Sequence, residues 1–449
     1  MNDRLPSKDA DLLIYGDTIL TMVPGKEIIH NGTIAVKDDL IVYIGDDNPH
    51  KVPFNAKEEI KADGGLVMPG MVNAHTHASM VCFRGMADDL PLMEWLNKYI
   101  FPAESKADGD LVFHGALLAC NEMILSGTTT FCDMYLFEDE VAKAAKRAGM
   151  RAVVGEVLFD FPSPNVKSHK EGLEYTEWLI NKWKGDPLIT PAVEPHAVYT
   201  CSPDFLLATK ELSCKYNVPL ITHLSESEGE VKEVKDKYGK SPVHLLKSIG
   251  FLGENLIADH CVCLTDDEMD ALKEFGVKVA HNPESNMKLA SGTAPIPELM
   301  SRGVPVGLGT DGCASNNNLD MFQEMDTTAK LHKVMRADPT VMNAKEVVEM
   351  ATIGSAKVLG LDDTIGTLEE GKKADIIIID MNKPHLTPLY NVYSHLVYTV
   401  NGADVETVII NGTLVMKDRK VLTIDQDDAM KNVREIAGKF KQNMRGNNE

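Results

Sequence analysis

Short apolar runs alternate with longer segments of helical character through the middle of the chain. Parallel strands connected by helices give this alternation, and each strand with its helix forms one βα unit. Eight such units predict an α/β fold of the (β/α)8 TIM-barrel type, whose active site lies at the carboxyl ends of the strands. The eight runs are LVMPGMVNAHTH, TTTFCDMY, RAVVGEVLF, ITPAVEPHAVY, PLITHLSE, LIADHCVCL, VKVAHNPESN and PVGLGTDG, with helical patterns such as residues 110–127 and 266–276 between them.

The two ends of the chain show a second pattern, in which β-branched residues are punctuated by glycine and aspartate, and this pattern predicts short strands. The segment IINGTLV near the carboxyl end resembles IIHNGTIAV near the amino end in both pattern and chemistry. Strand-rich ends around a different middle predict one smaller β-sandwich domain formed by both termini. The strands are expected in residues 11–22, 32–45, 64–70, 372–381 and 405–422.

These patterns divide the chain into three consecutive segments. The barrel is expected in residues 66–370, while residues 1–65 and 371–449 supply the sandwich. A charged helix from about Asp428 is expected to end the chain. Because a barrel of this type takes up about 250 residues, a chain of 449 residues accommodates it together with one further small domain.

The composition is that of a globular protein with a strongly acidic surface, since apolar residues make up 44% and the formal net charge is −22. An acidic chain repels phosphate groups, so we predict no binding to nucleic acid or to membrane surfaces. The amino end, MNDRLPSKDADLLIYGDTIL, has no signal-peptide apolar centre, which predicts a cytoplasmic protein. The eight cysteines include no Cys-x-x-Cys pair, and we expect them to be reduced.

Histidines occur at the ends of the apolar runs. His75 and His77 end the first run, and residues i and i+2 of a strand point to the same face. If that face is the barrel axis, both imidazoles can reach one ion, at a Zn–N distance of about 2.0–2.1 Å. His223 and Asp311, which end the fifth and eighth runs, are the natural candidates for the remaining ligands. The other run ends carry His196, His260 and His281.

Each of these residues has an ordinary structural explanation when it is taken alone. A buried histidine can bond a backbone carbonyl, and Thr-Asp-Gly can form a simple turn. At one end of the same barrel, however, they are consistent with one another and favour a metal site. A second ion would need a bridging ligand, such as a modified lysine at the end of the fourth strand, but ITPAVEPHAVYT contains no lysine. We therefore predict a single metal with an open position for water.

A glutamate follows the fifth run at a position suited to acid catalysis. Glu226 lies three residues after His223, on the loop expected above the metal. A carboxylic acid there can transfer a proton to a substrate whose carbon is attacked by metal-activated water. The alternative is a charge that stabilises a helix N-terminus. We interpret the following Glu228 and Glu230 as a solvated acidic face.

Apolar side chains after the first strand are candidates for the pocket walls. Residues 80–96, MVCFRGMADDLPLMEWL, supply methionine, phenylalanine and tryptophan, which suit an apolar group or a purine face. Helix packing is the alternative explanation. His281 and Asn282 are expected to shape the pocket floor rather than to bind the metal, because a fifth ligand would close the site.

The motifs PGMVNAHTHASM, THLSE, ADHCVCL, HNPESNMKLASG and GLGTDGCASNNNLDMF resemble those of the amidohydrolase superfamily. Within it, the chain resembles the 5-methylthioadenosine/S-adenosylhomocysteine deaminases and their chlorohydrolase relatives over nearly its whole length. The resemblance implies one divalent metal ion per subunit, with Zn²⁺ expected ahead of Fe²⁺ or Mn²⁺, and it allows a homo-oligomer. The metal ligands that it implies are His75, His77, His223 and Asp311.

The resemblance also implies roles for the residues that face the substrate. Asp311 would accept the proton of the attacking water, Glu226 would protonate N1 of an adenine, and His260 would orient the water. His196 would contact the substrate. Glu104, which from the sequence alone is only a charged residue after an aromatic–proline step, would accept hydrogen bonds from the two ribose hydroxyls.

The implied reaction is hydrolytic deamination of the 6-amino group of an adenosine-type nucleoside, which gives the inosine analogue and ammonia. The candidate substrates are 5′-methylthioadenosine, S-adenosylhomocysteine, adenosine and 5′-deoxyadenosine. Family members that bind S-adenosylhomocysteine hold its carboxylate with arginines, but GEVLFDFPSPNV after the third run contains none, so we expect a neutral 5′ group. The alternatives are a deaminase or chlorohydrolase that acts on a free base, pterin or triazine ring, and a non-catalytic scaffold.

Overall fold

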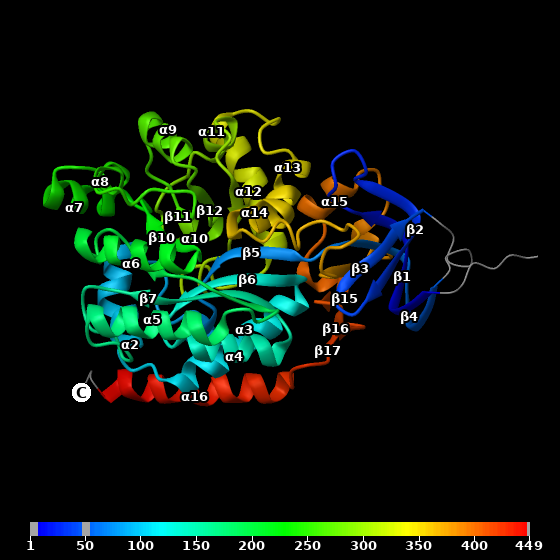
Figure 1. The fold of residues 1–449 in the computed structure, drawn as a ribbon, viewed down its shortest axis with the longest axis horizontal. Helices are drawn as coiled ribbons and strands as arrows, with labels where there is room; N and C mark the ends of the chain where they lie inside the picture. Colours follow the sequence, from blue (N-terminus) through cyan, green and yellow to red (C-terminus); the bar gives the residue numbers. More distant parts are fainter. Residues whose placement is uncertain (1–7, 47–53, 447–449) are drawn as a thin grey trace, which may run out of the picture.

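The computed structural model describes residues 8–46 and 54–446. The described residues do not include 1–7, 47–53 and 447–449. The start of the polar amino end and the last residues of the charged carboxyl end therefore lie outside the described residues. The described chain has two parts in Figure 1. Parallel strands surrounded by helices form the larger part, and a sheet built from both ends of the chain lies beside them.

Each of the eight apolar runs contains a parallel strand of the larger part, and the fourth run contains the two-residue β9 as well, so these predicted strands are confirmed. Every residue of β6, β7, β10 and β11 is buried, as expected of parallel strands that are covered on both faces. One sheet contains β5 (Met71–Thr76), β6 (Thr128–Tyr135), β7 (Arg151–Leu158) and β8 (Ile189–Pro191), with the short β9 (Glu194–Pro195) paired to β7; the other contains β10 (Leu220–Leu224), β11 (Leu256–His260), β12 (Lys278–His281) and β13 (Val306–Leu308).

Backbone hydrogen bonds connect the two parallel sheets on both sides. On one side, the N–H of Ile221 donates to the carbonyl of Val193 at 3.0 Å. On the other side, the N–H of Asp311 donates to the carbonyl of His75 at 3.0 Å. The end of the first strand therefore lies beside the end of the eighth, although most of the chain separates them in sequence.

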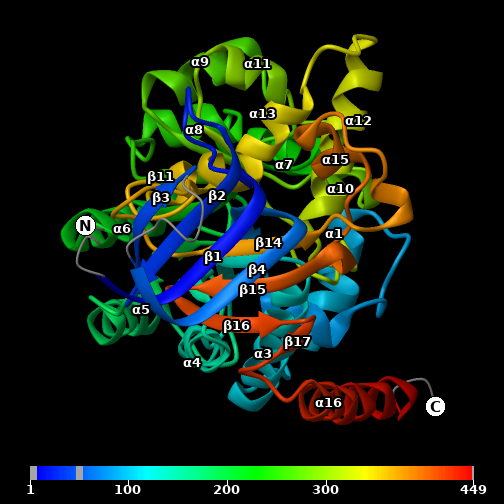
Figure 2. The ribbon, with the colours of Figure 1, turned by 90° about the vertical axis from the view of Figure 1, so that its right-hand side faces the viewer.

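Helices lie around these strands (Figures 1 and 2), and several begin at a side chain that caps the first turn. Asp108, Ser168, Ser227 and Asp320 each accept a hydrogen bond from a backbone N–H two or three residues ahead. The helices are η2 (Ala78–Phe83), α1 (Leu92–Trp95), η3 (Leu96–Ile100), α2 (Phe101–Glu104), α3 (Gly109–Leu125), α4 (Glu138–Ala148), α5 (His169–Trp183), α6 (Pro203–Tyr216), α7 (Glu228–Tyr238), α8 (Pro242–Ser248), α9 (Asp266–Glu274), α10 (Pro283–Lys288), α11 (Ile296–Ser301), α12 (Met321–Arg336), α13 (Ala344–Glu349), η4 (Met350–Gly354) and α14 (Ser355–Leu359).

The ends of the chain form one eight-stranded sheet in the order β17-β16-β15-β14-β4-β1-β2-β3, which confirms that both termini share a sheet. Strand β4 is longer than the strand expected in residues 64–70, because it has 16 residues. The predicted domain boundaries stay a prediction, and β4 continues across residue 65. The strands are β1 (Lys8–Leu20), β2 (Ile28–Lys37), β3 (Leu40–Gly45), β4 (Phe54–Pro69), β14 (Ile376–Asp380), β15 (Val405–Ile410), β16 (Thr413–Lys417) and β17 (Lys420–Val421).

The terminal sheet packs against the amino ends of the parallel strands. Arg151, the first residue of β7, is buried and binds the carboxylate of Asp375 through two nitrogens, at 3.0 and 3.2 Å. A side chain at Gly127, directly before β6, would lie 3.0 Å from Ile377 and 3.1 Å from Val405 of the sheet. The carboxyl ends of the strands therefore face away from the terminal sheet.

The chain returns along the outside of the larger part after the sheet. The short elements η5 (Pro384–Leu386), α15 (Val392–Tyr398) and η6 (Gly402–Asp404) precede the final strands. The last helix, α16 (Gln426–Gly446), begins two residues before the predicted start and crosses the outer surface in Figure 1. Its Phe440 ring lies 5.4 Å from the ring of Phe83. Within the described ranges, none of the helices has the length and apolar character that crossing a bilayer requires.

Candidate active site

Three histidines meet at the carboxyl ends of the parallel strands. His75 is in β5, His77 follows that strand directly, and His223 is in β10. Each offers a ring nitrogen, and these nitrogens all lie within 4.8 Å of one another. The prediction that His75 and His77 face the same interior space is therefore confirmed, and the structure places His223 with them.

Each of these rings is oriented by an oxygen at its Nδ1 atom. An oxygen at this position orients the ring, so that Nε2 points into the site. Burial and the neighbouring imidazoles hold the pKa of His223 well below its usual range, so this ring is neutral. The oxygens are Asp259 Oδ2 for His75 at 3.1 Å, the Met134 carbonyl for His77, and the His196 carbonyl for His223 at 2.8 Å.

Asp311 lies against the same nitrogens, as the sequence predicted. Its Oδ1 is 3.2 Å from His77 Nε2 and 3.7 Å from His75 Nε2. Burial alone would raise the pKa of Asp311, but the contact with His77 and the other imidazoles hold it well below its usual range. The carboxylate is therefore ionised, and hydroxyl groups of Ser285 and Ser315 fix its Oδ2 at 2.6 and 2.9 Å.

The residues present fit a divalent metal ion. Imidazole nitrogens with one carboxylate are a common ligand set for Zn²⁺ and related ions. His75 Nε2 is buried and has no hydrogen-bond partner, which costs free energy unless a ligand occupies the space in front of it. No ion is part of this structure, and within the described residues the cluster that could hold one is formed by His75, His77 and His223.

Glu226 and His260 lie beside this cluster and line the same cavity, as predicted. Both side chains are almost fully buried. Burial raises the pKa of Glu226 and so favours its protonated form near neutral pH. His260 is held by a contact between its Nδ1 and Asn286 Oδ1 at 2.8 Å, and its Nε2 lies 4.0 Å from Asp311 Oδ2.

Positive backbone φ angles occur at three of these strand ends. Ser225, His260 and Asp311 have φ angles of 52°, 69° and 61°, a region that residues other than glycine rarely adopt. Strained conformations persist where the surrounding structure fixes them, and they cluster at functional sites. Each of these residues is, or directly precedes, a residue that the sequence assigned to the site.

Glu230 corrects one sequence prediction. It was expected on a solvated acidic face, but it is fully buried, whereas Glu228 is exposed as expected. The carboxylate of Glu230 accepts hydrogen bonds from the N–H groups of Ser225 at 3.1 Å and Glu226 at 2.6 Å. Glu230 therefore fixes the loop that carries Glu226.

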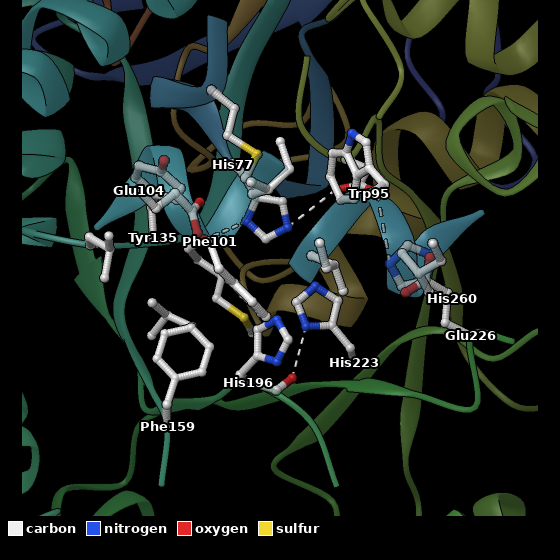
Figure 3. A pocket seen from close by; sticks show the side chains of 18 of the residues that line it. His77, Trp95, Phe101, Glu104, Tyr135, Phe159, His196, His223, Glu226 and His260 are labelled. Carbon is white, nitrogen blue, oxygen red and sulfur yellow. Dashed lines mark hydrogen bonds and ion pairs between the residues drawn. The ribbon is translucent and has the colours of Figure 1, made fainter. Parts of the chain in front are cut away.

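A cavity with about 590 Å³ of empty space extends from the histidine cluster. In Figure 3, Glu226 and His260 lie on one side of His77 and His223, while Glu104, Tyr135 and the rings of Phe101 and Phe159 lie on the other. Burial raises the pKa of Glu104 to about 7, and the adjacent Tyr135 hydroxyl offsets part of this effect. Glu104 and His196 thus line the cavity as predicted, at the end opposite Glu226.

The predicted walls and floor of the pocket are confirmed in part. Met80 and Trp95 line the cavity, whereas Phe83 is buried outside it and serves helix packing. The prediction for His281 and Asn282 is wrong. Both are buried without lining the cavity, and His281 Nε2 instead lies 3.2 Å from His332 Nε2.

Sequence reasoning missed several residues of the site. Asp259, which orients His75, directly precedes His260, and its adjacency to a candidate residue was an available signal. Tyr135 ends the second run and its position at a strand end was a similar signal. Phe159 and Tyr199 also line the cavity, and they end the third and fourth runs, so the same signal was available for them. Phe101 lies in the short helix α2, whose path cannot be read from apolar periodicity.

Comparison with known proteins places this site in a family. The sequence pattern that defines the amidohydrolase family matches residues 66–415, which include every residue described above. The chain belongs to the amidohydrolase family. This finding confirms the resemblance seen in the sequence motifs, and it agrees with hydrolytic chemistry at a histidine-rich metal site.

Three relatives place the chain within the amidohydrolase family more closely. A protein of Syntrophus aciditrophicus (strain SB) named 5-methylthioadenosine/S-adenosylhomocysteine deaminase 1 is 54% identical over 98% of this chain and 99% of its own. A protein of Methanosarcina mazei named 5′-deoxyadenosine deaminase is 46% identical over 95% of this chain and 98% of its own. The crystal structure of an adenosine deaminase from Xanthomonas campestris with bound zinc has a TM-score of 0.95 and 36% identity, covering 97% of this chain and all of its own.

Proposed function

We propose that this amidohydrolase deaminates the 6-amino group of adenosine-type nucleosides by hydrolysis and releases ammonia with the inosine analogue. The observation that carries the proposal is the arrangement of one cavity. A histidine cluster, Asp311 and Glu226 lie at one end, and Glu104 lies at the other. The names of the relatives, which refer to 5-methylthioadenosine, S-adenosylhomocysteine, 5′-deoxyadenosine and adenosine, support the same substrate class.

Four residues would hold one divalent ion per chain, for which we propose Zn²⁺ with Fe²⁺ or Mn²⁺ as alternatives. When it is bound, the ion supplies a Lewis acid that makes water nucleophilic near neutral pH. The zinc in the Xanthomonas campestris structure supports this choice of metal. The ligands are His75, His77, His223 and Asp311.

The other catalytic groups of the chain move protons. Asp311 is ionised and accepts a proton from the attacking water, which adds to C6 of the purine. Glu226, whose pKa is raised by burial, donates a proton to N1 of the same ring, so that the charge on the ring is neutralised as the C–O bond forms. His260, held by Asn286, orients the water. Asp311 then passes its proton to the amino group and Glu226 takes the proton of the new hydroxyl, so that collapse of the tetrahedral intermediate expels ammonia and leaves the 6-oxo ring.

The remaining groups bind the substrate. Glu104 accepts hydrogen bonds from the two ribose hydroxyls, and His196 contacts the base. Burial lowers the pKa of His196 to about 3, so its ring is neutral and one nitrogen can accept a hydrogen bond while Nδ1 contacts Thr200 Oγ1 at 2.9 Å. The apolar faces of Met80 and Trp95 cover the purine.

The same proposal includes the closure of the barrel, the division into domains, the cellular location and the partners. We propose that the eight parallel strands close into one (β/α)8 barrel, which the hydrogen bonds on both sides of the two sheets support. The terminal sheet would fold as a β-sandwich of residues 1–65 and 371–449, around the barrel of residues 66–370. The protein would act in the cytoplasm on a small nucleoside, without nucleic-acid or membrane partners, and as a monomer or homo-oligomer.

A substrate panel tests the proposal directly. Metal-loaded protein is expected to shift the adenine absorbance and release ammonia with 5′-methylthioadenosine, 5′-deoxyadenosine or adenosine. The variant Glu226→Gln should lower kcat by about 10²- to 10⁴-fold, since it cannot donate the proton to N1, while it retains the metal. Glu228→Gln is the matched control, because that side chain is exposed two residues further on. The absence of turnover across the panel would contradict the proposal.

The second candidate is a hydrolase of a free base, pterin or chlorinated triazine ring. Glu104 distinguishes it, because these substrates carry no ribose. Under our proposal Glu104→Gln lowers kcat/KM for nucleosides. Faster turnover of adenine, guanine or a chlorotriazine than of any nucleoside, unaffected by Glu104→Gln, would favour the second candidate instead.

A further inference from the structure

A second hollow adjoins the active-site cavity behind Glu104. It has about 550 Å³ of empty space and shares four lining residues with the first cavity, which are Phe101, Glu104, Leu136 and Phe159. Because the two spaces share these residues, a substrate whose ribose lies at Glu104 lies next to the second hollow, toward which its 5′ substituent can extend. This hollow reaches the surface at Phe161, which is 42% exposed.

Aromatic rings form a continuous wall from the site to this surface. The ring of Phe159 lies 4.9 Å from His196 and stacks on Phe161 at 4.6 Å with an interplanar angle of 19°. Phe101 packs edge-on against both rings, at 6.1 and 5.6 Å. Such a wall suits an apolar or polarizable group, including the sulfur of a thioether.

The charges around the second hollow disfavour an anion. Among the described residues that line it, the charged side chains are Glu104 and Lys167. The ammonium group of Lys167 donates to the carbonyls of Ser163 and Pro164, both at 2.7 Å, so its charge serves the loop that it closes. A carboxylate in this space would therefore face the Glu104 carboxylate and three rings, and none of the arginines in the described part of the chain lines either space.

We infer that the Phe101–Phe159–Phe161 wall is a specificity-determining subsite that accepts a small neutral 5′ substituent and discriminates against the amino-acid tail of S-adenosylhomocysteine. The inference rests on the proposed nucleoside deaminase function and names the substrate class within it. The 5′-methylthio group fits the wall through its methyl group and sulfur, and a 5′ hydrogen is tolerated. The zwitterionic tail loses water around two charges there without gaining an ion pair.

The test compares kcat/KM of the metal-loaded protein for 5′-methylthioadenosine, 5′-deoxyadenosine, adenosine and S-adenosylhomocysteine. We expect 5′-methylthioadenosine to exceed S-adenosylhomocysteine by at least about tenfold, the discrimination that a few well-placed apolar contacts provide. Phe161→Ala should raise KM for 5′-methylthioadenosine with little change in kcat, and by a larger factor than it raises KM for adenosine. Equal kcat/KM for 5′-methylthioadenosine and S-adenosylhomocysteine, with adenosine turned over, would overturn the inference and leave the proposed function intact.

A variant that is expected to gain activity on S-adenosylhomocysteine provides a second test. Phe161→Arg places a cation at the mouth of the subsite and should raise kcat/KM for S-adenosylhomocysteine relative to 5′-methylthioadenosine by about tenfold. Trp178→Arg is the matched control, because Trp178 is 46% exposed on α5, outside both spaces, and the change in net charge is the same. An unchanged ratio in Phe161→Arg, or the same rise in Trp178→Arg, would contradict the subsite. If the metal-loaded protein turned over none of the four nucleosides, that result would instead contradict both the proposed function and the inference.

Discussion

At the residue scale, the site depends on side chains that hold other side chains. The Asp259 carboxylate lies 3.1 Å from Nδ1 of His75, and this contact directs Nε2 of the ring inward. The Asp259 side chain is fully buried, so it cannot be replaced in this role by water without a cost in free energy. Carboxylates in this position are known to orient metal-binding histidines and to raise their basicity.

Asp259→Asn tests this positioning role. The amide is nearly the same size but presents a weaker acceptor to His75, so metal affinity should fall by about 10- to 100-fold. Competition with a chelator measures the affinity, and the melting temperature of the metal-free protein shows whether the fold is kept. Unchanged metal affinity in a folded Asp259→Asn protein would show that the orientation of His75 does not depend on this carboxylate.

Glu104 should give the reaction a pH dependence. Its pKa is raised to about 7, mainly by burial, and only the ionised form accepts hydrogen bonds from both ribose hydroxyls. As pH falls from 8 to 6, the ionised fraction drops roughly tenfold, so kcat/KM for nucleosides should fall with it. The ratio of wild-type to Glu104→Gln kcat/KM isolates this group from Glu226. A ratio that is constant from pH 6 to 8 would contradict the assignment.

At the element scale, the loop between β10 and α7 connects the fold to the chemistry. Ser225 has a positive φ angle, and the Glu230 carboxylate in the first turn of α7 returns to bond the N–H groups of Ser225 and Glu226. The sequence predicted the strand and the importance of Glu226, because both follow from an apolar run and a fixed offset from His223. It could not predict the burial of Glu230, because an acidic residue at a helix start is ordinarily solvated, and only the path of the loop encloses this one.

Glu230→Ala removes the support of that loop. Two buried N–H groups lose their acceptor, which costs about 1–3 kcal/mol each, so the melting temperature should fall by several degrees. The looser loop should lower kcat more than it raises KM, since Glu226 acts in the chemical step. Thermal unfolding and steady-state kinetics measure both effects, with Glu228→Ala as the exposed control. Wild-type kcat in Glu230→Ala would contradict the role of the loop.

The eight parallel strands were predictable because each is a buried apolar run flanked by helical segments. Strand β4 was predicted too short because its first half is polar. Its exposed residues alternate with partly or fully buried ones before the continuously buried segment begins at Gly65. Among the described strands, the polar half pairs with β1 alone, since β14 pairs only with the residues from Gly65 on, and the hydrogen bonds to β1 continue the strand past the end of its apolar pattern.

At the scale of the whole molecule, the terminal sheet and the parallel strands share one buried ion pair. Arg151 at the start of β7 binds Asp375, which precedes β14 and also accepts the N–H of Asn411 at 2.7 Å. The common sheet of the two termini was predictable from their similar patterns. The ion pair between Arg151 and Asp375 could not be predicted, because it joins residues that are 224 positions apart and that lie in ordinary polar contexts.

Arg151→Ala should destabilise the whole molecule. It leaves the Asp375 carboxylate buried without its partner, which typically costs about 3–5 kcal/mol. Arg302→Ala is the control, because its partners Asp266 and Asp270 are largely exposed and such pairs contribute about 0–1 kcal/mol. Denaturant unfolding measures the free energy of unfolding of both variants. Equal decreases of this free energy in the two variants would show that the buried pair does not hold the two parts together.

The most direct test of the account is turnover as a function of bound metal. The protein is stripped with a chelator, reloaded with known amounts of Zn²⁺, and assayed for ammonia release from 5′-methylthioadenosine. We predict no turnover without metal, a linear rise in rate up to one ion per chain, and no recovery in His223→Ala at the same metal concentrations. Full activity of the stripped protein, or a rate that continues to rise to a second ion, would contradict the single-metal deaminase site.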